Sequence, residues 1–303
     1  MLKWQIGEVT VTQVVELTTA SLGPYLLPQA TPGALSADPW LQPFIDEQSR
    51  IILSMHALII QAHGRTIMVD TCIGNDKERT YPKWNQMQGD FMHNFTQQGF
   101  TAPAIDTVLC THMHVDHVGW NTTLVDGVWQ PTFANAAYLF AEDEWAHWRT
   151  EVQEYGPVIE DSVQPIFDAG LAQLVPQSYQ VSDEVRLEPT PGHTPGHVSV
   201  HITSLGEEAV ITGDMIHHPC QIAHPNWATT ADTDQNAAVQ TRDAFLERYA
   251  DRPVLIIGTH FAGPTAGQIV RDGDAYRLDY RSRPQKPALV ASVAGQRCLK
   301  GRQ

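Results

Sequence analysis

Three histidines and an aspartate crowd into six positions at His112, His114, Asp116 and His117, directly after the apolar residues 105–110. A short apolar run of this kind predicts a buried strand, which would deliver the cluster at its end. Neutral imidazole and carboxylate groups are ligands that zinc and similar divalent metals accept. A histidine-rich surface loop is the alternative that any one of these histidines would leave open.

Three further candidate ligands follow at turn-marked strand ends. His193 lies in the Pro- and Gly-rich segment Pro191-Gly192-His193-Thr194-Pro195-Gly196-His197, Asp214 follows an expected strand at residues 209–212, and His260 follows one at residues 254–257. Rigid scaffolds commonly present functional groups on loops of this kind. The ordered set therefore favours a metal centre over a surface loop.

The order H-x-H-x-D-H, G-H-T-P-G-H, G-D and a late strand-end histidine resembles the metallo-β-lactamase-fold hydrolases over about residues 11–278. This resemblance implies an α/β (α+β) chain folded as a four-layer αββα sandwich. It also implies that residues 1–303 form one domain. Membership would make the protein a metal-dependent hydrolase.

The resemblance also implies a ligand set for two divalent metal ions. Zinc is the expected metal, and manganese, cobalt or iron would suit the same ligands. The first ion would be held by His112, His114 and His193, the second by Asp116, His117 and His260, and Asp214 would bridge them. Asp70 matches an aspartate that hydrogen-bonds a ligand imidazole, with a simple turn residue as the alternative, and His197 is interpreted as a supporting residue.

The segment from His260 to Leu278 is similar to that of the lactonase and methyl-parathion-hydrolase-like branch. That similarity implies attack on a lactone or carboxylic ester by a hydroxide bridging the two metals, with aryl phosphotriesters as further substrates. A glyoxalase II-like thioester hydrolase and a primary phosphotriesterase are the alternatives. A non-catalytic metal-binding protein is the least favoured of the four.

Two residues are candidates for catalytic roles. Asp116 could pass a proton to the leaving group. His217 stands three residues after Asp214, where many lactonases of this fold have a tyrosine that touches the substrate carbonyl, and a histidine can also donate a hydrogen bond. The departure from tyrosine puts acyl-homoserine lactone cleavage in doubt, and two surface histidines at 217 and 218 are the alternative.

Aromatic residues near the motifs could wall an apolar substrate pocket, although packing in the core is the alternative for each. Trp148 is favoured because phosphotriester-cleaving relatives have a leaving-group tryptophan in the corresponding helix. The expected pocket residues are Trp120, Trp148, His218 and Phe261.

Patterning predicts the remaining elements. Strands are expected at residues 8–16, 51–60, 66–69, 105–110, 185–187, 198–202, 209–212 and 254–257, with hairpins at 124–129 and 269–278. Helices are expected at residues 84–98, 141–152, 159–169 and 234–249. The proline-rich residues 18–50 should form an anchored loop that caps the site or mediates a homodimer.

Charge and composition limit the partners. Thirty-four acidic against nineteen basic residues give a formal charge of −15, which disfavours nucleic acid and an RNA nuclease. No run approaches the ~18 apolar residues of a membrane span, and the start shows no secretory signal, so a cytoplasmic location is expected. A flavo-diiron protein would need a further domain. Cys72, Cys110, Cys220 and Cys298 are spaced as free thiols. A small-molecule substrate is expected.

Overall fold

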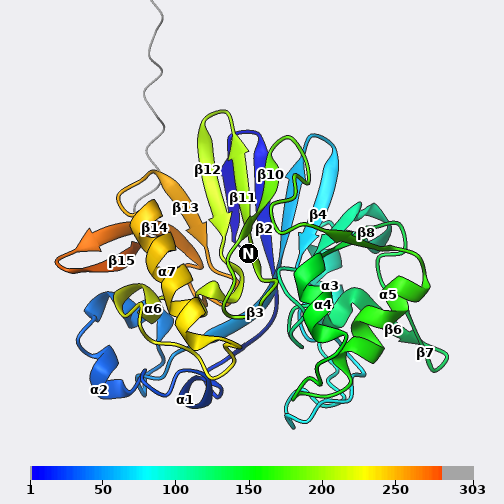
Figure 1. Cartoon of the computed structure of the whole chain (residues 1–303), viewed down its shortest axis with the longest axis horizontal. Coiled ribbons are helices and arrows are strands. Elements are labelled where there is room, and N and C mark those ends of the chain that lie inside the picture. The colour runs from blue at the N-terminus through cyan, green and yellow to red at the C-terminus, as the bar shows by residue number, and fades with distance from the viewer. Residues whose placement is uncertain (1, 282–303) are drawn as a thin grey trace, which may run out of the picture.

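Two β-sheets packed face to face form the centre of the molecule, and helices cover both outer faces (Figure 1). The computed structural model describes residues 2–281. The edge of the sandwich at the bottom of Figure 1 carries the loops that follow several strands, and the candidate ligands lie there.

The first sheet has seven strands, in spatial order β1 (Lys3–Ile6), β2 (Val9–Thr19), β3 (Leu53–Ala62), β4 (Arg65–Val69), β5 (Thr107–Leu109), β8 (Ala137–Ala141) and β9 (Ala172–Val175). Strands β1 to β4 pair antiparallel, and β4, β5, β8 and β9 pair parallel. The carboxyl ends of β4 and β5 therefore meet at one edge.

The second sheet has six strands, in order β10 (Val185–Pro189), β11 (Val198–Ser204), β12 (Glu207–Ile211), β13 (Val254–Ile257), β14 (Ala266–Asp272) and β15 (Ala275–Asp279). Its one parallel pair among the described residues is β12 with β13. A separate hairpin, β6 (Thr122–Val125) and β7 (Val128–Pro131), extends from the first half of the chain.

Alternate side chains of the central strands enter two different cores, as the pleat of a strand requires. In β3, Leu58 and Ile60 pack between the two sheets, whereas Ile59 packs toward the helices. In β12, Ile211 packs between the sheets and Val210 faces the helical side. These two cores confirm the predicted αββα order of layers.

The helices divide between the two outer faces. Beside the first sheet lie α3 (Phe91–Gln97), α4 (Glu142–Trp148), the π-turn η4 (Ile159–Val163) and α5 (Gln164–Asp168), and beside the second lie α6 (Cys220–Ala223) and α7 (Gln235–Tyr249). Helix α7 begins where predicted, since the Asp234 side chain accepts a hydrogen bond from the Ala237 amide.

Some predicted boundaries are wrong. The helix expected at residues 84–98 is only α3, because Gln86 has a positive φ of 51° and the Asn75 side chain bonds the Gly89 backbone in a loop. Strands β1, β8 and β9 were not predicted. The turns at His63-Gly64 and Asp126-Gly127 are confirmed, with both residues of each turn at positive φ.

Strand β2 extends into the proline-rich residues 18–50 as far as Thr19. The rest of this segment forms only short helices, which are α1 (Gly23–Leu26), α2 (Pro32–Leu35) and the 3₁₀ helix η1 (Pro39–Phe44). Leu27, Leu35, Leu41 and Phe44 anchor the segment in the core. Tyr25, in the same segment, is 53% exposed.

Within residues 2–281, no helix combines the length and apolar character needed to cross a bilayer. Cys72, Cys110 and Cys220 are buried free thiols, as predicted, and Cys298 lies outside the described residues.

Candidate metal centre

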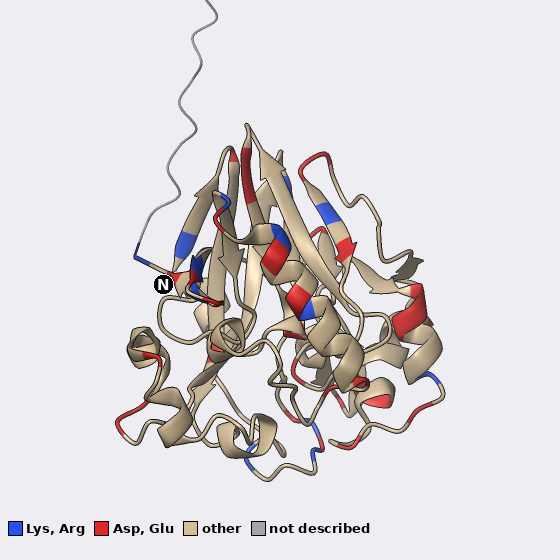
Figure 2. Cartoon of the chain, turned by 60° about the vertical axis from the view of Figure 1, so that its left-hand side comes forward, with Lys and Arg blue, Asp and Glu red and all other residues tan. Residues whose placement is uncertain are grey.

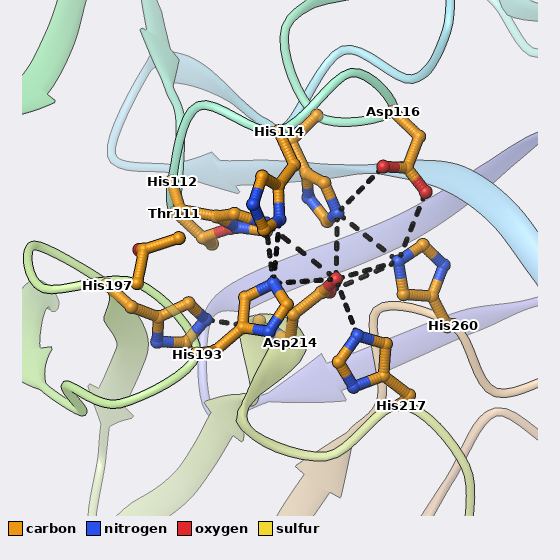
Figure 3. Close-up of polar contacts among 12 residues, drawn as sticks. Thr111, His112, His114, Asp116, His193, His197, Asp214, His217 and His260 are labelled. Carbon is orange, nitrogen blue, oxygen red and sulfur yellow. Dashed lines mark hydrogen bonds and ion pairs between the residues drawn. The ribbon is translucent and has the colours of Figure 1, made fainter. Parts of the chain in front are cut away.

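Candidate ligands from four separate loops converge at one edge of the sandwich (Figure 3). The loop after β5 supplies the first cluster, and His193 comes from the loop between β10 and β11. Asp214 and His260 follow β12 and β13, which run parallel and so end side by side. Parallel pairing thus gathers residues that are far apart in the sequence.

Three imidazoles form the first group. The Nε2 atom of His112 lies 3.1 Å from Nδ1 of His114 and 3.2 Å from Nε2 of His193. Nδ1 of His114 lies 2.9 Å from Nε2 of His193. His112 and His193 are buried, and His114 is partly buried.

The second group combines two imidazoles with a carboxylate. The Nε2 atoms of His117 and His260 lie 3.2 Å apart. One oxygen of Asp116 lies 3.7 Å from Nε2 of His117, and the other lies 3.6 Å from Nε2 of His260.

Asp214 lies between the two groups. Its Oδ2 atom is 3.7 Å from Nε2 of His112 and 3.6 Å from Nε2 of His193 on one side, and 3.2 Å from Nε2 of His117 on the other. Its Oδ1 atom is buried and lies 3.1 Å from Nε2 of His260, but it accepts no hydrogen bond from the described residues. Burial opposes ionisation of Asp214, but His117, His260 and the other imidazoles outweigh it and lower the pKa well below its usual value.

Most of these imidazoles have their outward nitrogen bonded to the protein. Nδ1 of His117 lies 2.9 Å from Asp70 Oδ2, and Nδ1 of His193 lies 2.9 Å from Asp232 Oδ1. Nδ1 of His260 lies 3.1 Å from the Ser54 carbonyl. Such bonds fix the tautomer and leave the inward nitrogen as a lone-pair donor.

Asp70 contacts both an imidazole of the second group and the segment before it. It accepts hydrogen bonds from the Thr111 amide at 2.7 Å and from the Thr111 hydroxyl, besides facing His117. Its backbone has a positive φ of 57°, which is strained for a residue other than glycine.

Protonation of the first group is disfavoured. Burial, reinforced by neighbouring imidazoles, lowers the pKa of both His112 and His114 well below the usual value. For His117 burial acts in the same direction, but the carboxylates of Asp214 and Asp70 outweigh it and raise the pKa. In the absence of a metal, the first group therefore supplies neutral imidazoles, whereas the carboxylates beside His117 favour its protonated form.

The donor set fits metal ions. Inward nitrogens 2.9–3.2 Å apart cannot all be satisfied by one another, because a neutral imidazole with a bonded outward N–H has only a lone pair to offer there. A cation at the centre of each group would satisfy these lone pairs, and it would also pair with Asp214 Oδ1, which accepts no hydrogen bond from the described residues and lies 3.1 Å from Nε2 of His260.

His197 supports the loop that carries Asp214. Its Nε2 atom accepts a hydrogen bond from the Asp214 amide at 2.8 Å, and its Nδ1 atom faces Thr190. Gly213 has a positive φ of 56°, and a Cβ there would lie 2.5 Å from the His197 ring. The Gly213-Asp214 pair thus requires glycine in its first position.

His217 also reaches the centre. Its Nε2 atom lies 3.1 Å from Asp214 Oδ2, and its Nδ1 atom is buried with no hydrogen-bond partner among residues 2–281. Its ring stacks on that of His260 with 12° between the planes. The alternative of a surface histidine does not apply, because the residue is 3% exposed.

A cavity of about 290 Å³ opens above the ligands. Its floor is formed by His114, Asp116, His193, Asp214, His217 and His260, and its apolar wall includes Leu22, Leu26, Leu53, Met55, Trp84 and Trp148. Trp148 packs edge-on against His114 with ring centroids 5.2 Å apart. No Lys or Arg in the described part of the chain lines this cavity.

Three of the four expected pocket residues lie elsewhere, so these positions are corrected. Trp120 is buried and donates to Glu16, and it stacks on Phe91. His218 is bonded to the Phe44 carbonyl, and Phe261 is fully buried in the core. The core accommodates Phe261 because its side chain is apolar, and it accommodates Trp120 and His218 because their ring nitrogens are hydrogen-bonded.

Several residues of the site carry no sequence signal. Asp232, which holds His193, is an isolated aspartate in a loop, and Glu144 is one of three acidic residues in the first turn of α4. Leu22, the N-cap of α1, and the α1 residues Tyr25 and Leu26 line the cavity from a segment that is remote in sequence. Only the folded chain shows these contacts.

Comparisons with known proteins identify the family and the fold. A family model described as the Metallo-beta-lactamase superfamily matches residues 54–260, more than half of the chain. No curated protein matches the chain by sequence.

Solved structures share the fold at low identity. AidC, described as a dizinc quorum-quenching lactonase, is 20% identical with a TM-score of 0.75, covering 93% of this chain and 97% of its own. The hydrolase AbOPH is 23% identical with a TM-score of 0.74, covering 91% and 96%. A probable metal-dependent hydrolase from Staphylococcus aureus is 21% identical with a TM-score of 0.69, covering 91% and 98%.

Proposed function

This chain belongs to the metallo-β-lactamase superfamily, and we propose that it is a dinuclear metal-dependent hydrolase of uncharged lactones and carboxylic esters. The observation that carries the proposal is the position of Asp214 Oδ2, within 3.7 Å of imidazole nitrogens from both groups at the floor of an apolar cavity. One carboxylate so placed can bridge two cations.

The first ion would be held by His112, His114 and His193, and the second by Asp116, His117 and His260. Zinc is the expected metal, although manganese, cobalt and iron accept the same donors. When bound, two such ions supply Lewis acidity that activates a water and polarises the bond to be cleaved.

The chain's own residues would position the reactants. Asp116 lines the cavity, and its side chain is 13% exposed. One of its carboxylate oxygens can therefore face a leaving group and transfer a proton to it. His217 lines the cavity floor with its Nε2 atom 3.1 Å from Asp214 Oδ2, and its Nε2–H would donate a hydrogen bond to the oxygen that develops charge.

The cavity favours an uncharged substrate. Its apolar wall suits an acyl or aryl group, and its lining includes Asp116, Glu154, Asp214 and Asp232 without a Lys or Arg in the described chain. A glutathione thioester carries carboxylates that would find no basic partner there. Thioester hydrolysis of that kind is therefore the less favoured alternative.

The charge distribution gives no support for nucleic-acid binding. Figure 2 shows Lys and Arg positions scattered among acidic ones rather than gathered into a stripe, and the formal net charge is −15. A phosphate backbone would be repelled.

The similar structures support the class of reaction. AidC is described as a dizinc lactonase and AbOPH as a hydrolase of the same superfamily. Aryl phosphotriesters are uncharged and fit the same cavity, so phosphotriesterase activity is the second candidate. A homodimer and a cytoplasmic location stay predictions.

The test is a hydrolysis panel on metal-analysed protein. It contains γ- and δ-lactones, an aryl ester, an aryl phosphotriester and a glutathione thioester, and it includes one aryl ester pair that differs only by a carboxylate at the acyl end. We expect turnover of the lactones or neutral esters, lost in Asp214→Ala but kept in Asp143→Ala, an exposed aspartate on α4. If protein with two bound metals hydrolyses no compound of the panel, the proposed substrate class is wrong.

A further inference from the structure

We propose that Glu144 is a positioning residue that holds the His112–His114 segment, the His193 loop and the cavity wall at Trp148 in one fixed arrangement. The inference rests on the proposed metal centre, and it assigns a role to a carboxylate that is not a ligand. Glu144 lies on α4, is 1% exposed and faces the two loops that supply the first group of imidazoles.

Four donors converge on the Glu144 carboxylate. Its Oε1 atom accepts from the Met113 amide at 2.9 Å and from the Trp148 indole N–H at 2.6 Å. Its Oε2 atom accepts from the Thr194 hydroxyl at 2.7 Å and from the Gly196 amide at 3.1 Å. Since every contact is a donor, the side chain acts as an ionised acceptor on both oxygens.

These donors belong to the ligand segments themselves. Met113 stands between His112 and His114, and Thr194 follows His193 directly. One buried carboxylate therefore joins both pieces of chain that form the first group. A shift of Glu144 would change the separation between imidazole nitrogens that now lie 2.9–3.2 Å apart.

The helix approaches the His193 loop too closely for any side chain at residue 196. A Cβ on Gly196 would lie 2.1 Å from the Glu144 amide nitrogen and 2.4 Å from its Cα. The contact is backbone against backbone, so it cannot relax by rotating a side chain. Gly196 thus allows Glu144 to reach across to both loops.

Trp148 connects the same carboxylate to the substrate wall. It lies one helical turn after Glu144, shares Oε1 with the Met113 amide, and packs against the His114 ring with centroids 5.2 Å apart. The same carboxylate therefore holds both Trp148, which a substrate would contact, and the segment whose imidazoles would bind the metal.

The Glu144→Gln substitution removes the negative charge at this position but keeps the shape of the side chain. An amide keeps one oxygen for Met113 and Trp148, but its NH₂ group then faces the Gly196 N–H, donor against donor. The negative charge beside the three imidazoles is also lost. Glu142→Gln is the matched control, because Glu142 lies on the same helix and is exposed.

The experiment measures zinc affinity of the full chain by competition with a chromophoric chelator, and the absorption spectrum of the cobalt(II)-loaded protein. We expect Glu144→Gln to weaken zinc binding about 10- to 100-fold and to alter the cobalt spectrum, as loss of a partner that orients ligands does. Glu142→Gln should match wild type in both. The cobalt spectrum reports ligand geometry, which a general loss of stability in a folded protein would not change.

Two further variants keep the inference testable if Glu144→Gln does not fold. Thr194→Val removes one bond to Oε2 and should weaken zinc binding several-fold, whereas Trp148→Phe removes one bond to Oε1 and should raise KM more than it lowers kcat. If Glu144→Gln, or Thr194→Val should Glu144→Gln not fold, has the zinc affinity and cobalt spectrum of wild type, the role of Glu144 is wrong and the proposed function is unaffected. If the wild-type protein binds no metal, both the role of Glu144 and the proposed function are wrong.

Discussion

At the scale of single residues, the centre depends on which nitrogen of each imidazole is free. Asp70, Asp232 and the Ser54 carbonyl occupy the outward nitrogens of His117, His193 and His260, so the inward nitrogens face one another. His217 differs, because its Nδ1 atom has no partner among the described residues while its Nε2 atom faces Asp214. His217 also lines the cavity, so its ring lies within reach of a bound substrate.

Replacing His217 tests this role. We expect His217→Gln to lower kcat for the ester or lactone identified by the panel about 100-fold, because a preorganised donor to a developing oxyanion is lost. Metal content, measured by elemental analysis, should equal that of wild type.

The matched control is His218→Gln, which changes the neighbouring histidine outside the cavity lining. Its kcat should stay within about twofold of wild type, as expected for a residue that does not face the reacting atoms. Loss of metal from His217→Gln would contradict the catalytic role and indicate a ligand role.

At the scale of elements, the site is an outcome of strand pairing and of close packing between a helix and a loop. Parallel pairing of β4 with β5 and of β12 with β13 places the residues that follow them at one edge. Helix α4 then packs directly on the loop that contains His193. Neither contact depends on a bound ion.

Gly196→Ala tests the close approach of α4. The added Cβ would meet the Glu144 backbone at 2.1 Å, so we expect a loss of about 1–3 kcal/mol in the free energy of unfolding, as overpacking of a buried site costs. Urea denaturation measures it. Gly33→Ala is the control, because a Cβ there meets no atom within 4 Å, and equal stability of the two variants would refute the packing argument.

The loop after β4 contains a second buried polar cluster, whose charged side chains do not line the cavity. Lys77 is fully buried, donates to the Thr122 hydroxyl at 2.6 Å and lies 3.6 Å above the Trp129 ring, while Arg79 pairs with Asp161. Burial lowers the pKa of Lys77 from 10.5 to about 7. The unfolded chain therefore binds a proton that the folded chain has lost between these two pH values.

Stability should accordingly rise with pH relative to a variant without the amine. The folded pKa is the lower one, so the penalty is present below pH 7 and is relieved as the pH rises toward 10.5. Between pH 7 and 9 we expect wild type to gain about 2–3 kcal/mol relative to Lys77→Met, at about 1.4 kcal/mol per pH unit. A difference that does not vary with pH in urea unfolding would show that the buried amine keeps its proton.

At the scale of the whole molecule, both sheets contribute ligands to each of the two groups at one edge of the sandwich. His112, His114, Asp116 and His117 come from the first sheet, and His193, Asp214 and His260 come from the second. Ions bound there would therefore connect the two halves of the sandwich. Any ligand that binds only the folded chain adds to its stability.

Metal removal should lower the melting temperature. We expect the chelated protein to unfold at lower temperature than protein with two zinc ions, because binding at 1,000 times Kd contributes about 4 kcal/mol. Calorimetry measures the difference, and Asp214→Ala should reduce it. Identical melting temperatures with and without zinc would contradict metal binding across the two sheets.

The sequence alone determined the elements with strong local signals. Apolar runs between turn residues predicted most central strands, and the His63-Gly64 and Asp126-Gly127 turns followed from residues that tolerate positive φ. The spaced motifs from His112 to His260 indicated the seven candidate ligands, because they follow strands that local patterning reveals, and the family resemblance added Asp70. Strands β1, β8 and β9 were missed since their short patterns compete with loop composition.

Only the tertiary structure decided which side chains share a space. Trp148 lines the cavity while Trp120 and Phe261 lie in the core, although all three side chains are large and apolar. Which of them faces the cavity depends on where the fold places the segment that carries it. Asp232 and Glu144 reach the ligand loops through packing between segments separated by 39 and 50 residues. Local sequence carries no signal for such contacts, since they form only when two sheets and a helix close on one another.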